Sequence, residues 1–490
     1  MALFKLLQSN SKLFPNKIAL IIDGKRFSYK EFYKLVLNTI QNLKRNNFSK
    51  NSVVIIVEDN SLSHILSLFA LSYLNSTIVP TGTYYSNDHL SEISRITNVN
   101  GIIGDNKYCN YFKKKMKIKN YLCTSKTKKF PYFFYKNKML RLPNNTIDKN
   151  KNFIITMTSG STAKPKPIVF SQETKIIRFR LFKNLYKIND KDNVIVTCPI
   201  DHSLGMRILL LPILSGGTCV VMNKFTVPSY CNLIKEHNVT FSVLVAHQIY
   251  ELIKNKYYFK SFYLKKGLVS ASAKLFANEK NKIINKKIRL YEMYGATEIG
   301  TVSSINISKD KKYYKSVGKS YHKKIRIKIL SDQNKFLPNY KSGEIVCKTP
   351  AKFKSYLNLN KLNKSSHFKG YFKTGDIGYL NKKNYLYFLS RKKNIIRRNG
   401  ITIYPEDIEN EILKDKNIKE AAVLGKETRG RTVIYLFVKK TLKLNDQYVK
   451  NICLKKLSTF QIPNNIIFLK NFPKTNLGKI NKNKLMNFIR

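Results

Sequence analysis

The sequence predicts an α/β protein with largely parallel sheets and more than one domain. Apolar runs of strand length, such as those at 53–57 and 194–196, alternate with helical patterns such as those at 29–43 and 62–73. Such alternation is typical of parallel strands joined by crossover helices. The length of 490 residues also exceeds what one hydrophobic core usually holds. We therefore expect at least two domains, with ample apolar content to fold them.

The pattern changes near the basic run at 391–394. Beyond this run, about 100 residues have their own alternation of strands and helices, which is enough for a small separate domain. We therefore place an N-terminal domain at residues 1–391 and a C-terminal domain at residues 392–490.

Segment 107–151 is the most biased part of the chain, because it is rich in lysine, tyrosine and phenylalanine. Aromatic and basic residues are interleaved in this way on proteins that bind single-stranded nucleic acids. Glycines and an RNP-like motif are missing, however. We therefore favour a basic variable insert for this segment.

The formal net charge of +61 would normally attract nucleic acids or an anionic membrane surface. Lysine, asparagine, isoleucine, tyrosine and phenylalanine are abundant everywhere, whereas glycine and proline are scarce and tryptophan is absent. This is the bias expected of an AT-rich genome. Charge that is spread so evenly is weak evidence for a partner, and we expect no nucleic-acid ligand.

The seven cysteines form no CxxC pair, and no apolar run approaches the ~20 residues of a membrane span. The start of the chain has too short an apolar core for a signal peptide and lacks a small-residue cleavage site. We expect a cytoplasmic protein with no disulfide, no structural zinc and no transmembrane segment.

Residues 155–167 read ITMTSGSTAKPKP and form the first candidate site. The apolar lead-in predicts a strand that ends in a loop of small and hydroxylated residues. Its backbone N–H groups, hydroxyls and lysine could wrap the oxygens of a polyphosphate. The loop is not a Walker A motif, which needs a second glycine directly before the lysine, and an ordinary surface loop is equally well supported here. The candidate residues are Thr158, Ser159, Gly160, Ser161, Thr162 and Lys166.

Two later stretches carry further candidate ligands. In YEMYGATEIG (291–300), Tyr294 offers a flat face for a base, Thr297 a hydroxyl for a phosphate, and Glu298 an oxygen ligand suited to Mg²⁺. In GYFKTGDIGYL (370–380), Gly375 predicts a turn on which Asp376 could accept both hydroxyls of a ribose. Each also has a plain structural reading, as a core tyrosine or a turn carboxylate.

The C-terminal part adds two more stretches. Pro405, followed by two acidic residues, is a good helix start. Lys479 follows Gly478 in a short glycine turn within FPKTNLGKINKNKL (472–485). A capped helix and a solvated lysine are the plain alternatives.

The ordered series TSGSTxxPK, YGATE, TGD, RKKxxIxxxGxxIYPxxIE and PKTxxGK resembles the AMP-forming acyl-adenylate superfamily, which includes the acyl-CoA synthetases. The resemblance covers nearly the whole chain. It implies a large N-terminal α/β domain with mixed, mostly parallel sheets packed with helices, and a small mobile C-terminal α+β domain. It also implies ATP and Mg²⁺ as ligands, with a carboxylic acid as the substrate.

The resemblance assigns roles to individual residues. The loop at 158–162 with Lys166 would hold the β- and γ-phosphates, and Tyr294 with Gly295 would contact the adenine end of ATP. Thr297 and Glu298 would hold the α-phosphate and Mg²⁺, and Asp376 with Arg391 would bind the ribose. Lys393 would be the hinge, and Lys479 would bridge the substrate carboxylate and the α-phosphate. The residues implied in catalysis are Lys166, Thr297, Glu298 and Lys479.

The implied reaction is ATP-dependent formation of an acyl-adenylate with release of pyrophosphate, followed by transfer to a thiol. Coenzyme A is the favoured acceptor, and the phosphopantetheine of a carrier protein is the alternative. Asp201 stands where amino-acid-activating relatives carry an aspartate, whereas His202 with Gly205 resembles the HxxG of acyl and aryl ligases. We favour a fatty or aryl acid over an amino acid.

Two departures from the family pattern leave a binding role open. Ala163 stands where glycine or serine is usual, and Pro167 stands where glycine is usual. Both residues restrict the backbone. A non-catalytic basic protein that binds RNA or anionic lipid is the remote alternative, and its binding would weaken steeply with salt.

Overall fold

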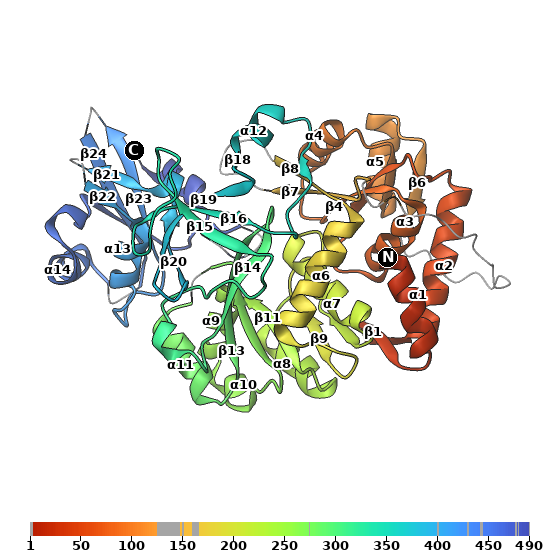
Figure 1. Ribbon diagram of the computed structural model, residues 1–490, viewed down its shortest axis with the longest axis horizontal. Helices are drawn as coiled ribbons and strands as arrows, with labels where there is room; N and C mark the ends of the chain where they lie inside the picture. The colour runs from red at the N-terminus through yellow and green to blue at the C-terminus, as the bar shows by residue number, and fades with distance from the viewer. Residues whose placement is uncertain are drawn as a thin grey trace.

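The computed structural model describes residues 3–124, 148, 151–158, 166–273, 275–398, 401–428, 431–441, 444–475, 478 and 480–489. Figure 1 shows a large body that carries the N-terminus and a smaller body, drawn in blue, that carries the C-terminus. The large body contains two broad sheets with helices packed on them, and a third, antiparallel sheet lies between it and the small body.

The first broad sheet has eight strands in the order β14-β13-β12-β11-β9-β10-β1-β2 among the residues described. Its inner strands are parallel, and only the edge strands β14 and β2 pair in the antiparallel sense. The strands are β1 (Ile18–Ile22), β2 (Lys25–Ser28), β9 (Asn193–Val196), β10 (Thr218–Val221), β11 (Phe241–Val245), β12 (Gly267–Ala271), β13 (Leu290–Ala296) and β14 (Gly300–Asn306).

The second broad sheet has seven described strands in the order β17-β8-β7-β4-β3-β5-β6. Strands β4, β3, β5, β6 and β7 are parallel, and β7, β8 and β17 form an antiparallel edge. The strands are β3 (Val53–Val57), β4 (Thr77–Thr81), β5 (Gly101–Gly104), β6 (Asn120–Cys123), β7 (Ile154–Thr158), β8 (Lys166–Phe170) and β17 (Ser355–Tyr356).

The third sheet is antiparallel throughout its described pairs. All strands of the two broad sheets except β17 precede it in the chain, and its last strand leads into the C-terminal part. Its strands are β15 (Arg326–Leu330), β16 (Gly343–Lys348), β18 (His367–Phe368), β19 (Tyr371–Leu380) and β20 (Leu386–Arg391).

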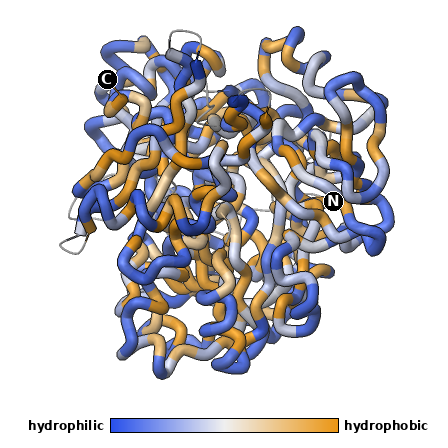
Figure 2. The backbone as a smooth tube through the Cα atoms, turned by 90° about the vertical axis from the view of Figure 1, so that its left-hand side faces the viewer, coloured by the Kyte–Doolittle hydropathy of each residue, from blue (hydrophilic) through white to orange (hydrophobic). Residues whose placement is uncertain are grey.

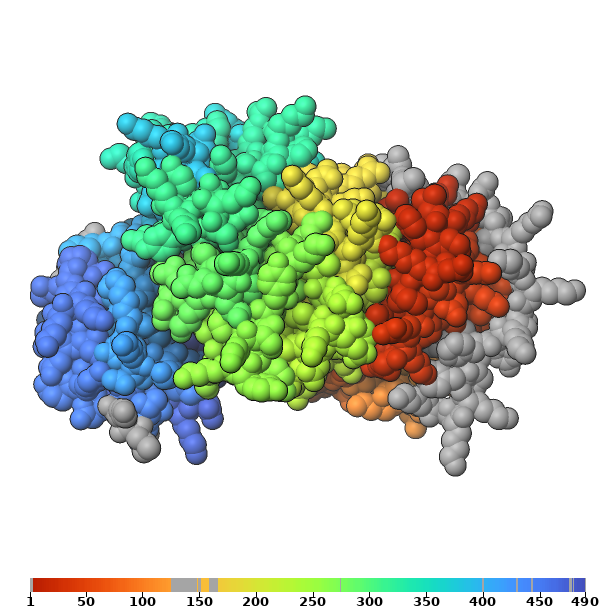
Figure 3. Space-filling view, turned by 90° about the horizontal axis from the view of Figure 1, so that it is seen from below, coloured from red at the N-terminus to blue at the C-terminus, as the bar shows by residue number. Residues whose placement is uncertain are grey.

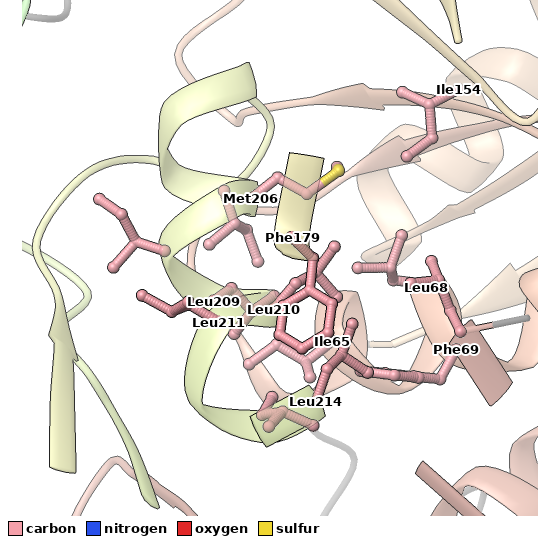
Figure 4. Close-up of a cluster of buried hydrophobic side chains, with 14 of the residues drawn as sticks. Ile65, Leu68, Phe69, Ile154, Phe179, Met206, Leu209, Leu210, Leu211 and Leu214 are labelled. Carbon is pink, nitrogen blue, oxygen red and sulfur yellow. The ribbon is translucent and has the colours of Figure 1, made fainter. Parts of the chain in front are cut away.

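Helices between the two broad sheets build the main core. Figure 4 shows Phe179 of α6 and Leu210 of α7 meeting Ile65 and Phe69 of α3, all in one buried cluster. The helices of the large body are α1 (Leu3–Leu13), α2 (Tyr29–Arg45), α3 (Leu62–Leu74), α4 (Asn87–Thr97), α5 (Asn106–Met116), α6 (Gln172–Tyr186), α7 (Ser203–Ser215), α8 (Val227–Glu236), α9 (Ala246–Lys254), α10 (Lys256–Ser261), α11 (Ala277–Asn285) and α12 (Asn360–Ser365), with the 3₁₀ turn η1 (Lys311–Tyr313).

The C-terminal part has a hydrophobic core of its own, built from residues at 396–457. A second apolar cluster, at 422–489, covers the other face of its sheet. Its strands are β21 (Ile396–Arg398), β22 (Ile401–Ile403), β23 (Ala421–Thr428), β24 (Arg431–Lys439) and β25 (Asn465–Leu469), its helices are α13 (Pro405–Ile412), α14 (Asp446–Lys456) and α15 (Lys482–Leu485), and its 3₁₀ turns are η2 (Lys392–Asn394), η3 (Thr459–Gln461) and η4 (Met486–Phe488).

Local sequence signals explain several of these boundaries. Helix α2 starts at a capping box, in which the Ser28 hydroxyl accepts from the Glu31 N–H while the Glu31 carboxylate accepts from the Ser28 N–H. Pro405 begins α13, as predicted.

Figure 2 shows the hydrophobic residues, in orange, gathered along the inner strands, while hydrophilic residues occupy the periphery.

The predicted α/β class with a large and a small domain is confirmed, whereas the interpretation of 107–151 is wrong for its first part. Residues up to 116 lie in α5, and 120–123 form β6 at the edge of the seven-stranded sheet. Tyr108 and Phe112 are buried, so this stretch is part of the core rather than an insert. Most of the remainder lies outside the described residues. Within the described part of the chain, no helix has the length and apolar character needed to cross a bilayer.

Candidate functional site

The carboxyl ends of the parallel strands of both broad sheets meet at one place. Asp201 and His202 follow β9 of the eight-stranded sheet, and Tyr84 follows β4 of the seven-stranded sheet. The Tyr84 hydroxyl donates to the Asp201 carboxylate and lies 3.2 Å from Nε2 of His202. Ligands of open α/β sheets bind at such strand ends, so this edge is the candidate site.

Asp376 is the most constrained carboxylate of the site. It lies on β19 with its side chain only 2% exposed, and its Oδ1 is 2.8 Å from Nε of Arg391 on the paired strand β20. The Tyr294 hydroxyl on β13 donates to Asp376 Oδ2 at 2.7 Å. Burial and the Asp376 charge raise the pKa of Tyr294 well above its ordinary value. Three sequence-predicted residues are therefore brought together across two sheets.

The predicted turn at Gly375 is a kink inside a strand. Gly375 has φ +69° and lies within β19, not between two elements. This left-handed backbone suits glycine, and its N–H donates to Oε1 of Glu344 at 3.0 Å. The expectation of a turn is wrong, but an irregular backbone is present directly before Asp376.

Thr297 and Glu298 lie in the tight connection between β13 and β14. Ala296 pairs with Gly300 across it, and a Cβ at Gly295 would approach the Gly300 carbonyl oxygen to 2.0 Å. Only glycine fits at this position, which explains the glycine of YGATE. The connection thus presents Thr297 and Glu298 at the end of β13, beside Tyr294.

Glu298 is held from two sides. The Tyr356 hydroxyl on β17 donates to Glu298 Oε1 at 2.9 Å, and Arg178 Nη2 on α6 donates to the Glu298 carbonyl at 2.9 Å. Burial and the Glu298 charge raise the pKa of Tyr356, so it remains a donor. No cluster of three or more His, Cys, Asp or Glu side chains that could bind a metal occurs among the residues placed in the structure. A single protein carboxylate is nevertheless typical for Mg²⁺ that is bound mainly by phosphates and water.

The candidate phosphate loop is placed only at its two ends. Thr158 of β7 pairs with Lys166 of β8 in an antiparallel register, so the loop joins adjacent strands. Ser159, Gly160, Ser161, Thr162 and Ala163 lie outside the described residues. Pro167 lies in β8, where its carbonyl accepts from the Leu357 N–H at 2.9 Å. Proline is the second residue of this strand, next to the start of β8, where a missing N–H interrupts the ladder least.

Positive side chains gather around Lys393, and Lys166, at one end of the candidate phosphate loop, is among them. Burial, followed by the charges of Arg391, Lys166 and Lys482, lowers the pKa of Lys393. Lys393 lies in η2, directly after β20, at the junction of the two bodies. Such a concentration of cations favours a polyanion between the two bodies.

The predicted glycine turn near the C-terminus is confirmed for its described residues. Gly478 has φ +72°, and its N–H donates to the Thr475 carbonyl at 2.8 Å. A Cβ at Gly478 would lie 3.1 Å from Cδ2 of His247, at the start of α9. The turn therefore packs against the strand-end edge of the eight-stranded sheet, and Figure 3 shows the C-terminal part (blue) in contact with the large body. Lys479 itself lies outside the described residues.

The candidate acid-pocket residues are fixed by close packing. A Cβ at Gly205 would approach the Pro199 carbonyl oxygen to 2.0 Å, so the glycine of HxxG lets α7 begin against this turn. Asp201 is buried, and its charge with burial raises the pKa of Tyr84. His64 of α3 is also buried. Burial lowers the pKa of His64, whereas the charges of Asp201 and Glu58 act to raise it.

Some residues of the site carry no sequence signal strong enough to identify them. Tyr84 and Tyr356 belong to no motif, and only the fold brings them to Asp201 and Glu298. Lys482 lies just beyond the PKTxxGK motif, and its charge acts on Lys393. Lys175 and Arg178 are different, because they interrupt the apolar pattern of α6 at a spacing of three and are buried. Buried cations at that spacing on an apolar helix face could have been noticed.

Comparison with known proteins places the chain among adenylate-forming enzymes. A family model described as AMP-binding enzyme matches residues 7–357, and one described as AMP-binding enzyme C-terminal domain matches residues 407–479. A 2-succinylbenzoate–CoA ligase from Listeria innocua is 25% identical over 98% of this chain and 98% of its own length. An indoleacetate–CoA ligase from Aromatoleum aromaticum is 25% identical over 69% of this chain and 67% of the relative.

A solved structure has the same fold. The o-succinylbenzoate CoA synthetase from Bacillus subtilis, in complex with its acyl-adenylate intermediate, superimposes with a TM-score of 0.87 at 21% identity. The match covers 98% of this chain and 97% of that chain. The resemblance carried by the motifs and the fold that it implied are both confirmed.

Proposed function

Because the chain belongs to the AMP-binding enzyme family, we propose that it is an AMP-forming acid–thiol ligase. It activates a carboxylic acid with ATP and Mg²⁺, releases pyrophosphate, and transfers the acyl group to coenzyme A. The free cysteines of the described residues support a reducing, cytoplasmic location.

The observation that carries the proposal is the contact of Asp376 with both Arg391 and Tyr294, where Tyr294 lies on the strand that leads into Glu298. Asp376 supplies the acceptor for the two ribose hydroxyls, and Arg391 holds that carboxylate in position at 2.8 Å. Tyr294 offers the base a ring whose hydroxyl is already fixed by Asp376. A nucleoside bound here has its phosphates directed to Thr297, Glu298 and the 158–166 loop.

Catalysis then depends on alignment and fixed positive charge, because a carboxylate must approach an α-phosphate that is itself anionic. Lys166 and Lys479 supply charge to the departing pyrophosphate and to the reacting oxygens. Thr297 and Glu298 hold the α-phosphate and Mg²⁺, and Tyr356 orients the Glu298 carboxylate. Packing of the Gly478 turn on His247 excludes water from the hydrolysable adenylate.

We propose an aryl acid rather than a fatty acid as the substrate. The curated relatives at similar identity include ligases named for 2-succinylbenzoate and for indoleacetate, both aromatic acids. The Asp201 carboxylate is engaged by Tyr84, which favours a structural role for it over recognition of an amino acid's ammonium group. Coenzyme A is the acceptor in the names of these relatives, so we favour it over a carrier protein.

The test is pyrophosphate release with hydroxylamine trapping of the adenylate, across aryl, fatty and amino acids. Lys479→Ala should lower the rate on the preferred acid by ~10²- to 10³-fold, since it removes one preorganised positive donor. Lys484→Ala, which removes an exposed lysine of the same C-terminal segment, is the matched control and should leave the rate within about twofold. Folded protein that binds ATP yet releases no pyrophosphate with any acid would contradict the proposal.

A further inference from the structure

Three cationic side chains, Lys175, Arg178 and Arg207, line a small cavity between α6 and α7. Lys175 and Arg178 are each only 4% exposed, and Nε of Arg207 is buried although that residue as a whole is partly exposed. The cavity leaves about 10 Å³ for the centre of a water-sized group, so it has room for one small group. The other lining residues are Phe179, Ser203, Met206 and Leu210.

The charges of this cavity are not balanced by adjacent acidic groups. Arg178 donates to the Ala351 carbonyl at 2.8 Å and to the Ser203 hydroxyl at 3.2 Å, both neutral acceptors. The Lys175 ammonium lies over the Phe170 ring, 4.0 Å from its centroid. Among the described residues, no carboxylate lies within ion-pair distance of any of the three cations.

Arg207 has an unused donor in the same place. Its Nη1 donates to the Thr301 hydroxyl at 2.6 Å, whereas its Nε is buried without an acceptor among the residues that the structure describes. A buried donor without an acceptor destabilises the folded state, and buried cations without counter-charges destabilise it more. The cavity therefore lacks both a hydrogen-bond acceptor and a negative charge.

Loss of a proton can remove only one of the three charges. Burial, and then the charges of Arg178 and Arg207, lower the pKa of Lys175 well below its ordinary value, but a guanidinium keeps its proton in proteins. Two guanidiniums that repel each other therefore remain even where Lys175 is neutral. The Glu298 carboxylate offsets part of the charge of Arg178 only from beyond ion-pair distance. A water molecule could accept from Arg207 Nε, but it would bring no charge.

We propose that this cavity is a binding site for one chloride ion, held by Lys175, by Nε of Arg207 and by the Ser203 hydroxyl. The Ser203 oxygen accepts from Arg178, so its own proton remains available as a donor to the ion. A single-atom anion suits the small volume. The apolar side chains of the wall, which belong to the buried cluster of Figure 4, offer no donors to the further oxygens of a carboxylate or a phosphate.

The ion would support the connection between β13 and β14 from behind. Arg178 Nη2 donates to the Glu298 carbonyl at 2.9 Å, and Arg207 holds the Thr301 hydroxyl on β14. An anion that fixes both guanidiniums therefore also fixes the two ends of this short segment. The inference goes beyond the proposed function and does not depend on it.

Thermal melting at constant ionic strength tests the inference. The unaltered protein is prepared in sodium gluconate and titrated with sodium chloride, so that screening of the surface lysines does not change. The melting temperature should rise by about 2 °C or more and then saturate, because the ion binds only the folded state. Sodium bromide should act in the same way. Equal melting temperatures in gluconate and chloride would overturn the inference.

Substitutions in the cavity locate the effect. Lys175→Met and Arg207→Met should each raise the chloride concentration at half of the full effect by at least about 10-fold, because each removes a charged donor. In gluconate, Lys175→Met should melt no lower than the unaltered protein, since it removes a buried charge without a partner. Arg180→Met, which removes an exposed cation of the same helix, is the control and should respond to chloride as the unaltered protein does. An unchanged response in both cavity variants would place the ion elsewhere and refute the assignment.

Crystals of the unaltered protein grown in sodium bromide provide a measurement that needs no variant. The anomalous signal of bromine should show one ion in contact with Lys175 Nζ and Arg207 Nε. Electron density in the cavity without an anomalous signal would identify a water molecule, and the inference would be wrong. Neither melting nor diffraction requires turnover, so the chloride site and the ligase function can fail independently.

Discussion

Asp376 has a structural role, and in the proposed function it also binds the ribose. It is buried at 2% exposure between the Tyr294 hydroxyl and the guanidinium of Arg391, which is itself 48% exposed. A buried carboxylate with two such partners has a fixed orientation, which is what recognition of a diol requires. Asp332 offers a comparison, because it pairs with Lys392 at the same 2.8 Å but is 73% exposed.

We predict that Asp376→Asn raises the KM for ATP by roughly 10- to 100-fold, since it removes a charged acceptor from a charge-assisted hydrogen-bond site. It should also lower the free energy of unfolding by about 1–3 kcal/mol, less than for a fully buried pair because Arg391 can reach water. Steady-state kinetics and urea titration measure the two effects. Asp332→Asn should leave the KM for ATP within about twofold and change the free energy of unfolding by no more than about 0.5 kcal/mol. Equal effects of the two substitutions would show that Asp376 has no special role.

At two positions of the candidate site, backbone geometry itself demands the residue type. The close approach of the Gly300 carbonyl requires glycine at 295, and the positive φ at 375 suits glycine, so both glycines are visible in the sequence as signals of an unusual backbone. Tyr84 and Tyr356 are held only by tertiary contacts, and nothing in the neighbouring sequence indicates that they face Asp201 and Glu298. Such residues become visible only when both sheets are in place.

At the scale of elements, α13 carries a pH-sensitive feature. Glu406 lies in the first turn of this helix. Burial raises the pKa of the Glu406 carboxyl above the ordinary 4.5; the charge of Lys482 opposes this shift and the charge of Glu409 adds to it. The protonated form is therefore favoured in the folded state. The stability that protonated Glu406 contributes is fully present below pH 4.5, and it is lost as the pH rises through the raised pKa of Glu406 in the folded state.

Glu406→Gln should accordingly stabilise the protein at about pH 8 and have a smaller effect near pH 5, because glutamine carries no charge to bury. The urea midpoint at several pH values measures this. Glu411→Gln is the control on the same helix, since its carboxylate pairs with Lys414 near the surface. An advantage of Glu406→Gln that does not vary with pH would refute the assignment.

Elements with strong periodic patterns were predicted well, and those with biased composition were not. The apolar runs at 53–57 and 194–196 are strands, and the patterns at 29–43 and 62–73 are helices, with ends moved by one or two residues. The first part of the 107–151 segment was misread, because its lysines concealed the buried face formed by Tyr108 and Phe112 on α5. Its aromatic residues were counted as surface features, although two of them fill the core.

At the scale of the whole molecule, the chain forms two bodies with separate cores, and the candidate site has residues on both. The boundary proposed at 391/392 coincides with the end of β20, and the core of the C-terminal part begins at Ile396. The sequence could indicate this division, because a second alternation of strands and helices begins there. It could not indicate the arrangement of the two bodies, which depends on contacts such as that of Gly478 with His247.

That contact allows a direct test of whether the small domain must move between the two half-reactions. A Cβ at Gly478 would lie 3.4 Å from Cβ of His247, close to the ~3.5–4.5 Å that a disulfide requires. We predict that the double variant His247→Cys with Gly478→Cys, once oxidised, still forms the adenylate but makes coenzyme A thioester at least about 10-fold more slowly than after reduction. The physical reason is that the cross-link holds the Gly478 turn over the adenylate, where a thiol must approach.

The same protein in its oxidised and reduced forms is its own control, because the two substitutions are present in both. Pyrophosphate release reports the first half-reaction and thioester formation the second. The unaltered chain, oxidised in parallel, corrects for its own cysteines, which are buried or partly buried where the structure describes them. If the oxidised form made thioester as fast as the reduced form, both half-reactions would proceed in the arrangement seen here, and Lys393 would need no role as a hinge.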